Sequence, residues 1–114
     1  MGRPKTPEGY VLDAVRAGLR ILGSRCYLVR QQQGLGSVLG VPDLMGIIDG
    51  RGFGIECKAG RGKLTPAQVE HSGRIRAAGG VWCEARSFDD VISAFEAAGI
   101  KLPFQPKLID RRQT

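Results

Sequence analysis

Three residues combine chemical types and spacings that could form a catalytic site. Asp43 follows a proline, and Glu56 precedes Lys58 by two positions. Alternate residues of a strand face the same side, so Glu56 and Lys58 share one face while Cys57 points the other way. Carboxylates gathered at one end of a sheet bind a hard cation such as Mg²⁺ or Mn²⁺, and a nearby ammonium holds a water or a phosphate oxygen. This set favours metal-dependent hydrolysis of a phosphodiester bond.

A turn signal lies between the two halves of this set. The pair Asp49-Gly50 separates two apolar segments, residues 43–49 and 52–58, which is typical of a tight β-hairpin. Folding back at this turn would bring Asp43 beside Glu56. The alternative is that Pro-Asp is ordinary turn chemistry and that the Glu/Lys pair is a surface ion pair with no catalytic role.

The rest of the chain predicts the elements that must position these residues. Thr-Pro capping signals begin two of the expected helices, and glycines end them. The expected helices cover residues 7–22, 66–78 and 88–98, and the expected strands cover residues 26–30, 43–49, 52–58 and 81–85. The order is αβββαβα in one domain of residues 1–114, with residues 1–7 and 100–114 extended or flexible.

Composition narrows the classes of partner and compartment. The chain has 17 Lys and Arg against 11 Asp and Glu, a formal charge of +6, which favours a polyanionic partner such as nucleic acid. Its three cysteines are odd in number and widely spaced, which argues against a disulfide framework or a Cys-x-x-Cys zinc site. No apolar run suits a signal peptide or a membrane span. We expect an intracellular protein with no membrane partner.

An ordered series of motifs resembles the VRR-NUC nucleases of the PD-(D/E)xK superfamily. The resemblance rests on Gly40-Val41-Pro42-Asp43-Leu44, Ile55-Glu56-Cys57-Lys58, Gly62-Lys63-Leu64-Thr65-Pro66-Ala67-Gln68 and the pair Gly79-Gly80 before a strand. It implies an α/β, restriction-endonuclease-like core of order αβββαβ, to which this chain adds a C-terminal helix and an extended tail. The stand-alone members are linked to phages, and the resemblance therefore implies a phage or prophage protein in the cytoplasm of a bacterial host.

The resemblance also implies roles for individual residues. The catalytic residues would be Asp43, Glu56, Lys58 and Gln68, and the ligands of Mg²⁺ or Mn²⁺ would be Glu8, Asp43, Glu56 and the main-chain carbonyl of Cys57. Two of these residues have simpler explanations. Gln68 fits the third position of a capping box, and Glu8 fits the acidic first turn that a helix dipole favours.

Basic residues near these motifs are candidates for contacts to nucleic acid. Arg61, Lys63, Arg74 and Arg76 flank the site in the sequence and could bind phosphates, or they could form a solvated surface.

The resemblance implies a structure-selective DNA endonuclease that resolves four-way (Holliday) junctions, as in DNA repair, and acts as a homodimer. Apolar residues available for the dimer interface are Val91, Ile92, Phe95, Leu102, Phe104, Leu108 and Ile109, although those of the last helix could instead fill the core. The alternatives are a nicking or restriction-like nuclease, an RNA-directed or tRNA-directed nuclease and a non-catalytic DNA-binding module. A missing metal ligand would mark the last of these, and none is missing.

Overall fold

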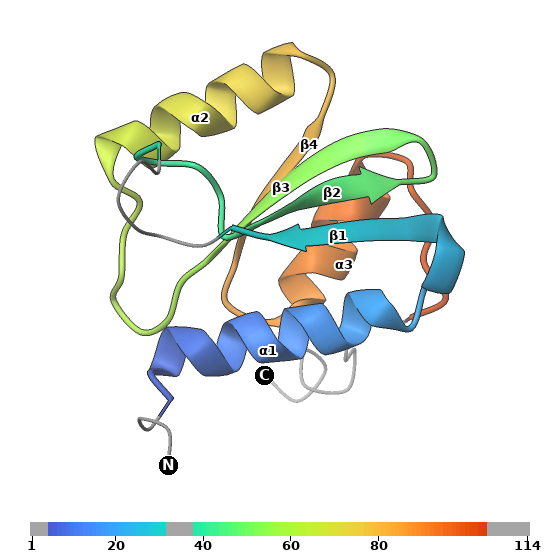
Figure 1. Ribbon diagram of the computed structural model, residues 1–114, viewed down its shortest axis with the longest axis horizontal. Helices are drawn as coiled ribbons and strands as arrows, with labels where there is room; N and C mark the ends of the chain where they lie inside the picture. Colours follow the sequence, from blue (N-terminus) through green and yellow to red (C-terminus); the bar gives the residue numbers. More distant parts are fainter. Residues whose placement is uncertain (1–4, 32–37, 105–114) are drawn as a thin grey trace, which may run out of the picture.

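The computed structural model describes residues 5–31 and 38–104 and has the predicted α/β architecture. Figure 1 traces its elements in the expected order. The helices are α1 (Pro7–Arg20), α2 (Pro66–Ala77) and α3 (Phe88–Ala97), the strands are β1 (Cys26–Arg30), β2 (Leu44–Ile48), β3 (Arg51–Cys57) and β4 (Val81–Ala85), and a 3-10 turn, η1, spans Gly23–Arg25. Thr6 and Thr65 cap α1 and α2 through their side chains, which confirms both predicted helix starts.

The strands form one sheet in the order β1-β2-β3-β4. The first three pair antiparallel, and β4 pairs parallel to β3 after the crossover through α2. Asp49 and Gly50 both have positive φ, 50° and 81°, as a tight hairpin turn requires of its two central residues. The hairpin is therefore confirmed, and its register pairs Leu44 with Ile55, one residue from Asp43 and Glu56.

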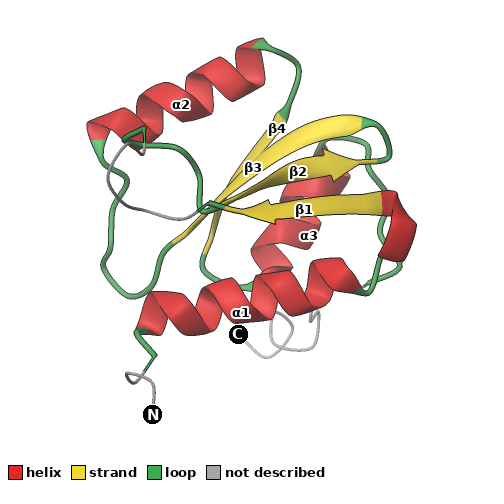
Figure 2. Ribbon diagram, in the orientation of Figure 1, coloured by secondary structure: helices red, strands yellow, loops and turns green. Residues whose placement is uncertain are grey.

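Helices cover both faces of the sheet (Figure 2). Phe53 packs edge-to-face on Phe95 of α3, with ring centroids 5.3 Å apart, and α1 packs against α3 on the same side. The next residue, Gly54, faces Ile75 of α2 on the other side. The core therefore lies between the sheet and the α1/α3 layer, while α2 packs mainly on β3 and β4 on the opposite face.

The last helix does not provide the dimer interface suggested as one possibility from its sequence. Val91, Ile92 and Phe95 are buried in the core of the single chain, with exposures of 0–2%. The sequence could not separate these two roles, because an apolar helix stripe looks the same in a core and in an interface. Leu102 is also buried, whereas Phe104 packs edge-to-face on Phe88 and is only partly buried.

Both ends of the chain extend past the described residues. Residues 100–104, predicted to be extended or flexible, form no helix or strand, but Ile100 joins Leu102 in the core. Residues 1–4 and 105–114, including Leu108 and Ile109, lie outside the described residues, as does most of the glycine-rich loop after β1. Among the described helices, none is long and apolar enough to span a membrane.

The packing of α1 on α3 gives a first test of the fold. Gly18 of α1 lies against the Phe88 ring, and a Cβ at Gly18 would fall inside van der Waals distance of three ring atoms. We expect Gly18→Ala to lower the free energy of unfolding by about 1–3 kcal/mol, because the close-packed layer cannot take an added methyl without shifting.

Gly73 of α2 is the matched control, since its Cβ would meet no atom within 4 Å. Gly73→Ala should stabilise the protein by about 0.5–1 kcal/mol through helix propensity. Urea denaturation of both variants measures the difference, and equal midpoints would contradict this packing.

Candidate functional site

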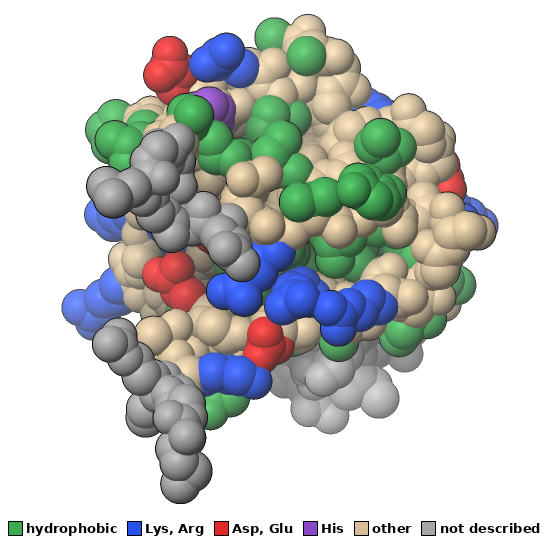
Figure 3. Space-filling view, in the orientation of Figure 1, with side chains coloured by type: hydrophobic (Ala, Val, Ile, Leu, Met, Phe, Trp, Pro, Cys, Tyr) green, Lys and Arg blue, Asp and Glu red, His purple; other side chains and the backbone are tan. Residues whose placement is uncertain are grey.

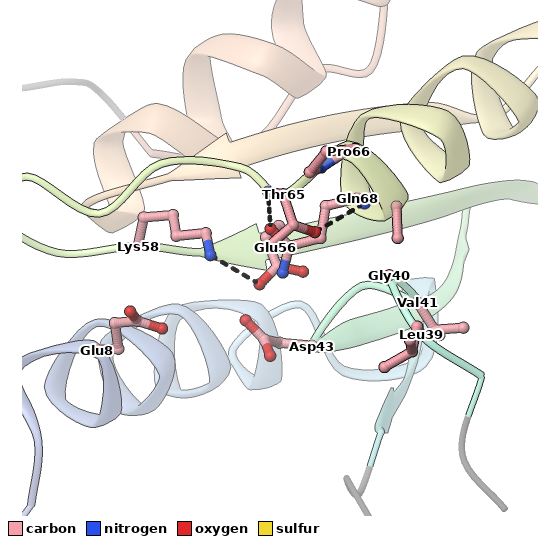
Figure 4. A pocket seen from close by; sticks show the side chains of 11 residues that line it. Glu8, Leu39, Gly40, Val41, Asp43, Glu56, Lys58, Thr65, Pro66 and Gln68 are labelled. Atoms are coloured by element: carbon pink, nitrogen blue, oxygen red, sulfur yellow. Dashed lines mark hydrogen bonds and ion pairs between the residues drawn. The ribbon is translucent and has the colours of Figure 1, made fainter.

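Asp43 lies just before β2 and is tied to the end of β3. Its Oδ2 accepts a hydrogen bond of 2.8 Å from the main-chain N–H of Cys57. This bond joins the two arms of the hairpin where the predicted residues meet, and Figure 4 shows Asp43 pointing toward Glu56. The sequence-based expectation that folding at Asp49-Gly50 brings Asp43 and Glu56 together agrees with this geometry.

Glu56 is a buried carboxylate that lacks a complete set of partners. It is only 3% exposed, and its Oε1 has no hydrogen-bond partner among the described residues. The ammonium of Lys58 lies 3.9 Å from its Oε2, at the limit of an ion pair. Burial raises the pKa of Glu56 to about 8, and the negative charge of Asp43 adds to the rise. Two adjacent carboxylates, one with an unpaired buried oxygen, fit a bound divalent cation.

A pocket of about 430 Å³ surrounds these groups. It is lined by Glu8, Leu39, Gly40, Val41, Asp43, Glu56, Lys58, Thr65, Pro66, Ala67 and Gln68. Figure 4 shows that these residues come from the start of α1, the segment before β2, the end of β3 and the start of α2. Four segments that are separate in the sequence therefore line one pocket.

The predicted ligands Glu8 and Cys57 occupy different positions in this site. Glu8 is exposed on the first turn of α1 and lines the pocket, but no three His, Cys, Asp or Glu side chains within the described residues lie close enough to hold a metal together. The thiol of Cys57 is buried on the core face of β3, which leaves only its main-chain carbonyl as a possible ligand. The donor set still fits Mg²⁺, which commonly takes one or two carboxylates and completes its shell with water and substrate phosphates.

Gln68 forms the capping box that the sequence suggested as its simpler role. Its Oε1 accepts from the N–H of Thr65 at 2.9 Å, and its own N–H donates to Thr65 Oγ1 at 3.1 Å. The capping role is confirmed. The side chain also lines the pocket, so capping holds Gln68 beside Asp43 and Glu56 and does not remove it from the site.

The four basic residues predicted to bind nucleic acid fall into two groups. Arg61 and Lys63 are exposed on the loop between β3 and α2, directly after Lys58. Arg74 and Arg76 lie in the last turn of α2, six to eight residues beyond Gln68, which is roughly 9–12 Å along a helix. Arg76 also stacks on Trp82, with its guanidinium 5.1 Å from the ring centroid. The first group is therefore close to the site and the second is at the far end of its helix.

Sequence reasoning missed Arg86, which follows β4. Its guanidinium donates to the main-chain carbonyls of Gly60 and Gly62 in the loop after Lys58. No local sequence signal could have revealed this, because the partners are main-chain atoms 24 and 26 residues away.

Comparison with known proteins finds one similar solved structure to report. A scan of the sequence against protein-family models and a search of curated proteins found no match. A solved structure described as a VRR_NUC domain superposes with a TM-score of 0.64 at 28% sequence identity, over 81% of this chain and 97% of that chain. Its agreement with the predicted element order and motif series supports a nuclease domain of the VRR-NUC type in this chain.

Proposed function

We propose that this domain is a Mg²⁺- or Mn²⁺-dependent DNA endonuclease that hydrolyses phosphodiester bonds at the pocket around Glu56. The observation that carries the proposal is the unpaired Glu56 carboxylate oxygen, buried beside Asp43 and next to the Lys58 ammonium. A fold maintained only for stability gains nothing from a buried unpaired carboxylate.

The roles of the side chains follow from their positions. Asp43, Glu56 and the Cys57 carbonyl would hold the cation, which when bound neutralises charge on the scissile phosphate and lowers the pKa of a water. Lys58 would place its ammonium against a phosphate oxygen or the attacking water. Glu8 at the rim of the pocket would act through water, and Gln68 would offer its amide nitrogen to the same water or to the substrate.

DNA as the substrate is supported by the distribution of positive charge. The exposed Arg61 and Lys63 adjoin the pocket. Figure 3 shows further Lys and Arg side chains gathered in the middle of one face of the molecule. On α1, an ion pair with Lys5 lowers the pKa of Asp13, and Arg16 and Arg30 lower it further, so these cations lie near one carboxylate. A phosphate backbone that passes over this face would meet several cations on its way to the pocket.

We further propose that the substrate is a four-way junction and that the active form is a homodimer. Each domain offers one candidate site, whereas resolving a junction requires two symmetrical cuts, which a two-fold dimer supplies. An interface is available on the outer face of the sheet, where Tyr27 pairs with Ile47 and both are exposed, next to the exposed Val29. α2 does not cover this part of the sheet. In keeping with the resemblance of the motifs to stand-alone phage members, we propose that the protein acts in DNA processing in a bacterial host cytoplasm.

The test is cleavage by the purified protein of a panel of linear duplex, flap, splayed-arm and four-way-junction DNAs, with an RNA stem-loop added. We expect junction cleavage with Mg²⁺ or Mn²⁺, complete loss with EDTA, and a mass near twice that of the chain in sedimentation. Cleavage that persists in EDTA and is unaltered in Asp43→Ala would contradict the proposed metal site. Equal cutting of junction and linear duplex, or a monomer at micromolar concentration, would contradict the junction proposal. DNA binding without cleavage would favour the non-catalytic module.

A further inference from the structure

The Arg86 side chain donates hydrogen bonds to the loop of residues 59–63, which connects the end of β3 to the start of α2 in the candidate site. Its Nη1 donates to Gly60 O at 2.9 Å, and its Nη2 donates to Gly62 O at 2.6 Å and to Glu84 Oε2 at 2.9 Å. The Arg86 main-chain N–H donates separately to Asp90 Oδ2 at 2.8 Å. Glu84 on β4 thus orients the guanidinium, whose two terminal nitrogens donate to two carbonyls of the loop.

This loop lies directly against the candidate site. A Cβ at Gly62 would be 3.6 Å from Lys58 Cδ and 3.7 Å from Glu8 Oε2, so Gly62 lies beside both of these side chains. The two carbonyls that Arg86 holds also bracket Arg61, whose side chain remains exposed. Through this loop, Arg86 can fix the surroundings of Lys58 and the direction in which Arg61 points.

Among the described residues, the loop has few other hydrogen bonds of its own. It contains Gly60, with a φ of +56°, and a turn in which the Gly62 N–H donates to Ala59 O at 3.0 Å. Glycine has more conformational freedom than other residues, and such a loop loses more entropy when it is ordered. The planar guanidinium of Arg86 holds both carbonyls and so restricts the conformations of this loop.

We propose that Arg86 is a positioning residue for the nuclease reaction, which holds the loop of residues 59–63 so that Lys58 and Arg61 meet the substrate in place. The role rests on the proposed function. It differs from direct binding of a phosphate, because three of the five N–H donors of the Arg86 side chain are directed at the protein's own Gly60, Gly62 and Glu84. It also makes the C-terminal end of β4 part of the machinery, although that strand contributes no residue to the lining of the pocket.

The test compares Arg86→Gln and Arg86→Lys with a matched control, Arg51→Gln. Arg51 is also an exposed arginine whose side chain donates to two main-chain carbonyls, Gly79 O at 3.1 Å and Ala98 O at 2.6 Å, away from the pocket. We expect Arg86→Gln to increase amide hydrogen exchange in residues 59–64 and to lower the single-turnover rate at saturating DNA about tenfold, less than the roughly hundredfold that a displacement of about 1 Å can cost. Arg86→Lys, which keeps the charge and can hold one carbonyl, should recover part of the rate. Arg51→Gln should leave both readouts at their wild-type values.

Two outcomes would overturn the role of Arg86. Unchanged exchange in residues 59–64 of Arg86→Gln would show that the loop does not need the residue, and a salt-dependent loss of DNA affinity alone would then identify a direct phosphate contact. A loosened loop with an unchanged rate would show a structural bond without a positioning role. If the wild-type protein cleaves no nucleic acid in the panel, the proposed function fails, and the exchange measurement still decides whether Arg86 holds the loop.

Discussion

Lys58→Ala is expected to lower the single-turnover rate of DNA cleavage about a hundredfold, the usual cost of removing one preorganised charge from an active site. Lys58 is 8% exposed, and its ammonium is directed at the Glu56 carboxylate in the pocket and not into the apolar core. Its main-chain N–H donates to Ala85 O, and this bond survives the substitution. Fold and DNA affinity should therefore remain close to those of the wild type.

Lys101→Ala is a suitable control, because Lys101 is an exposed lysine outside the pocket. Circular dichroism and a binding titration on catalytically inactive mixtures without metal should give matching results for both variants. If Lys58→Ala cleaves at nearly the normal rate, the Glu-x-Lys motif is structural, and the DNA-binding module becomes the better interpretation.

Glu56→Gln is expected to affect stability and activity in opposite directions. Without metal, the folded protein keeps the Glu56 proton up to a pKa of about 8, whereas the unfolded chain releases it near the ordinary value of 4.5. Between these values the unfolded state binds fewer protons, so stability falls as pH rises through this window. The amide of Gln carries no charge and escapes this loss. We expect the variant to be more stable than the wild type at pH 8 by roughly 1–3 kcal/mol, because only the wild-type side chain has to carry a buried charge there.

Metal should reverse this order. Mg²⁺ or Mn²⁺ should raise the melting temperature of the wild type, because a ligand that binds only the folded state stabilises it, and should raise that of Glu56→Gln much less. Cleavage by the variant should fall about a hundredfold or more. Thermal denaturation at pH 5 and pH 8, with and without metal, measures all of this, with the exposed Glu96→Gln as control. A variant that keeps the metal-dependent shift would remove Glu56 from the proposed ligand set.

Local signals in the sequence were enough to predict the elements and the approach of Asp43 to Glu56 in the candidate site. Thr65-Pro66 predicts the start of α2 because capping involves residues within one turn, and Asp49-Gly50 predicts the hairpin because the turn itself demands positive φ. Once the hairpin is known, the meeting of Asp43 with Glu56 follows from strand geometry.

The features that could not be predicted depend on contacts between distant segments. The position of Glu8 at the rim depends on how α1 packs, and Arg86 acts on carbonyls that have no side-chain signature. The burial of Val91 was open in the sequence, because periodicity reveals an apolar face but not what covers it.

The mixed pairing of the sheet has a consequence for the order in which the site forms. β2 and β3 are neighbours in the chain and can pair early, which brings Asp43 to the Cys57 N–H at little cost in chain entropy. β4 pairs in parallel with β3 only after the long crossover through α2. Contacts between residues so far apart in the sequence form more slowly. We expect α2 and the loop of residues 59–63 to complete the pocket only after that docking, so that the two carboxylates come together in water and lose their hydration late. We therefore expect the energetic cost of burying the two carboxylates to fall on the last step of folding.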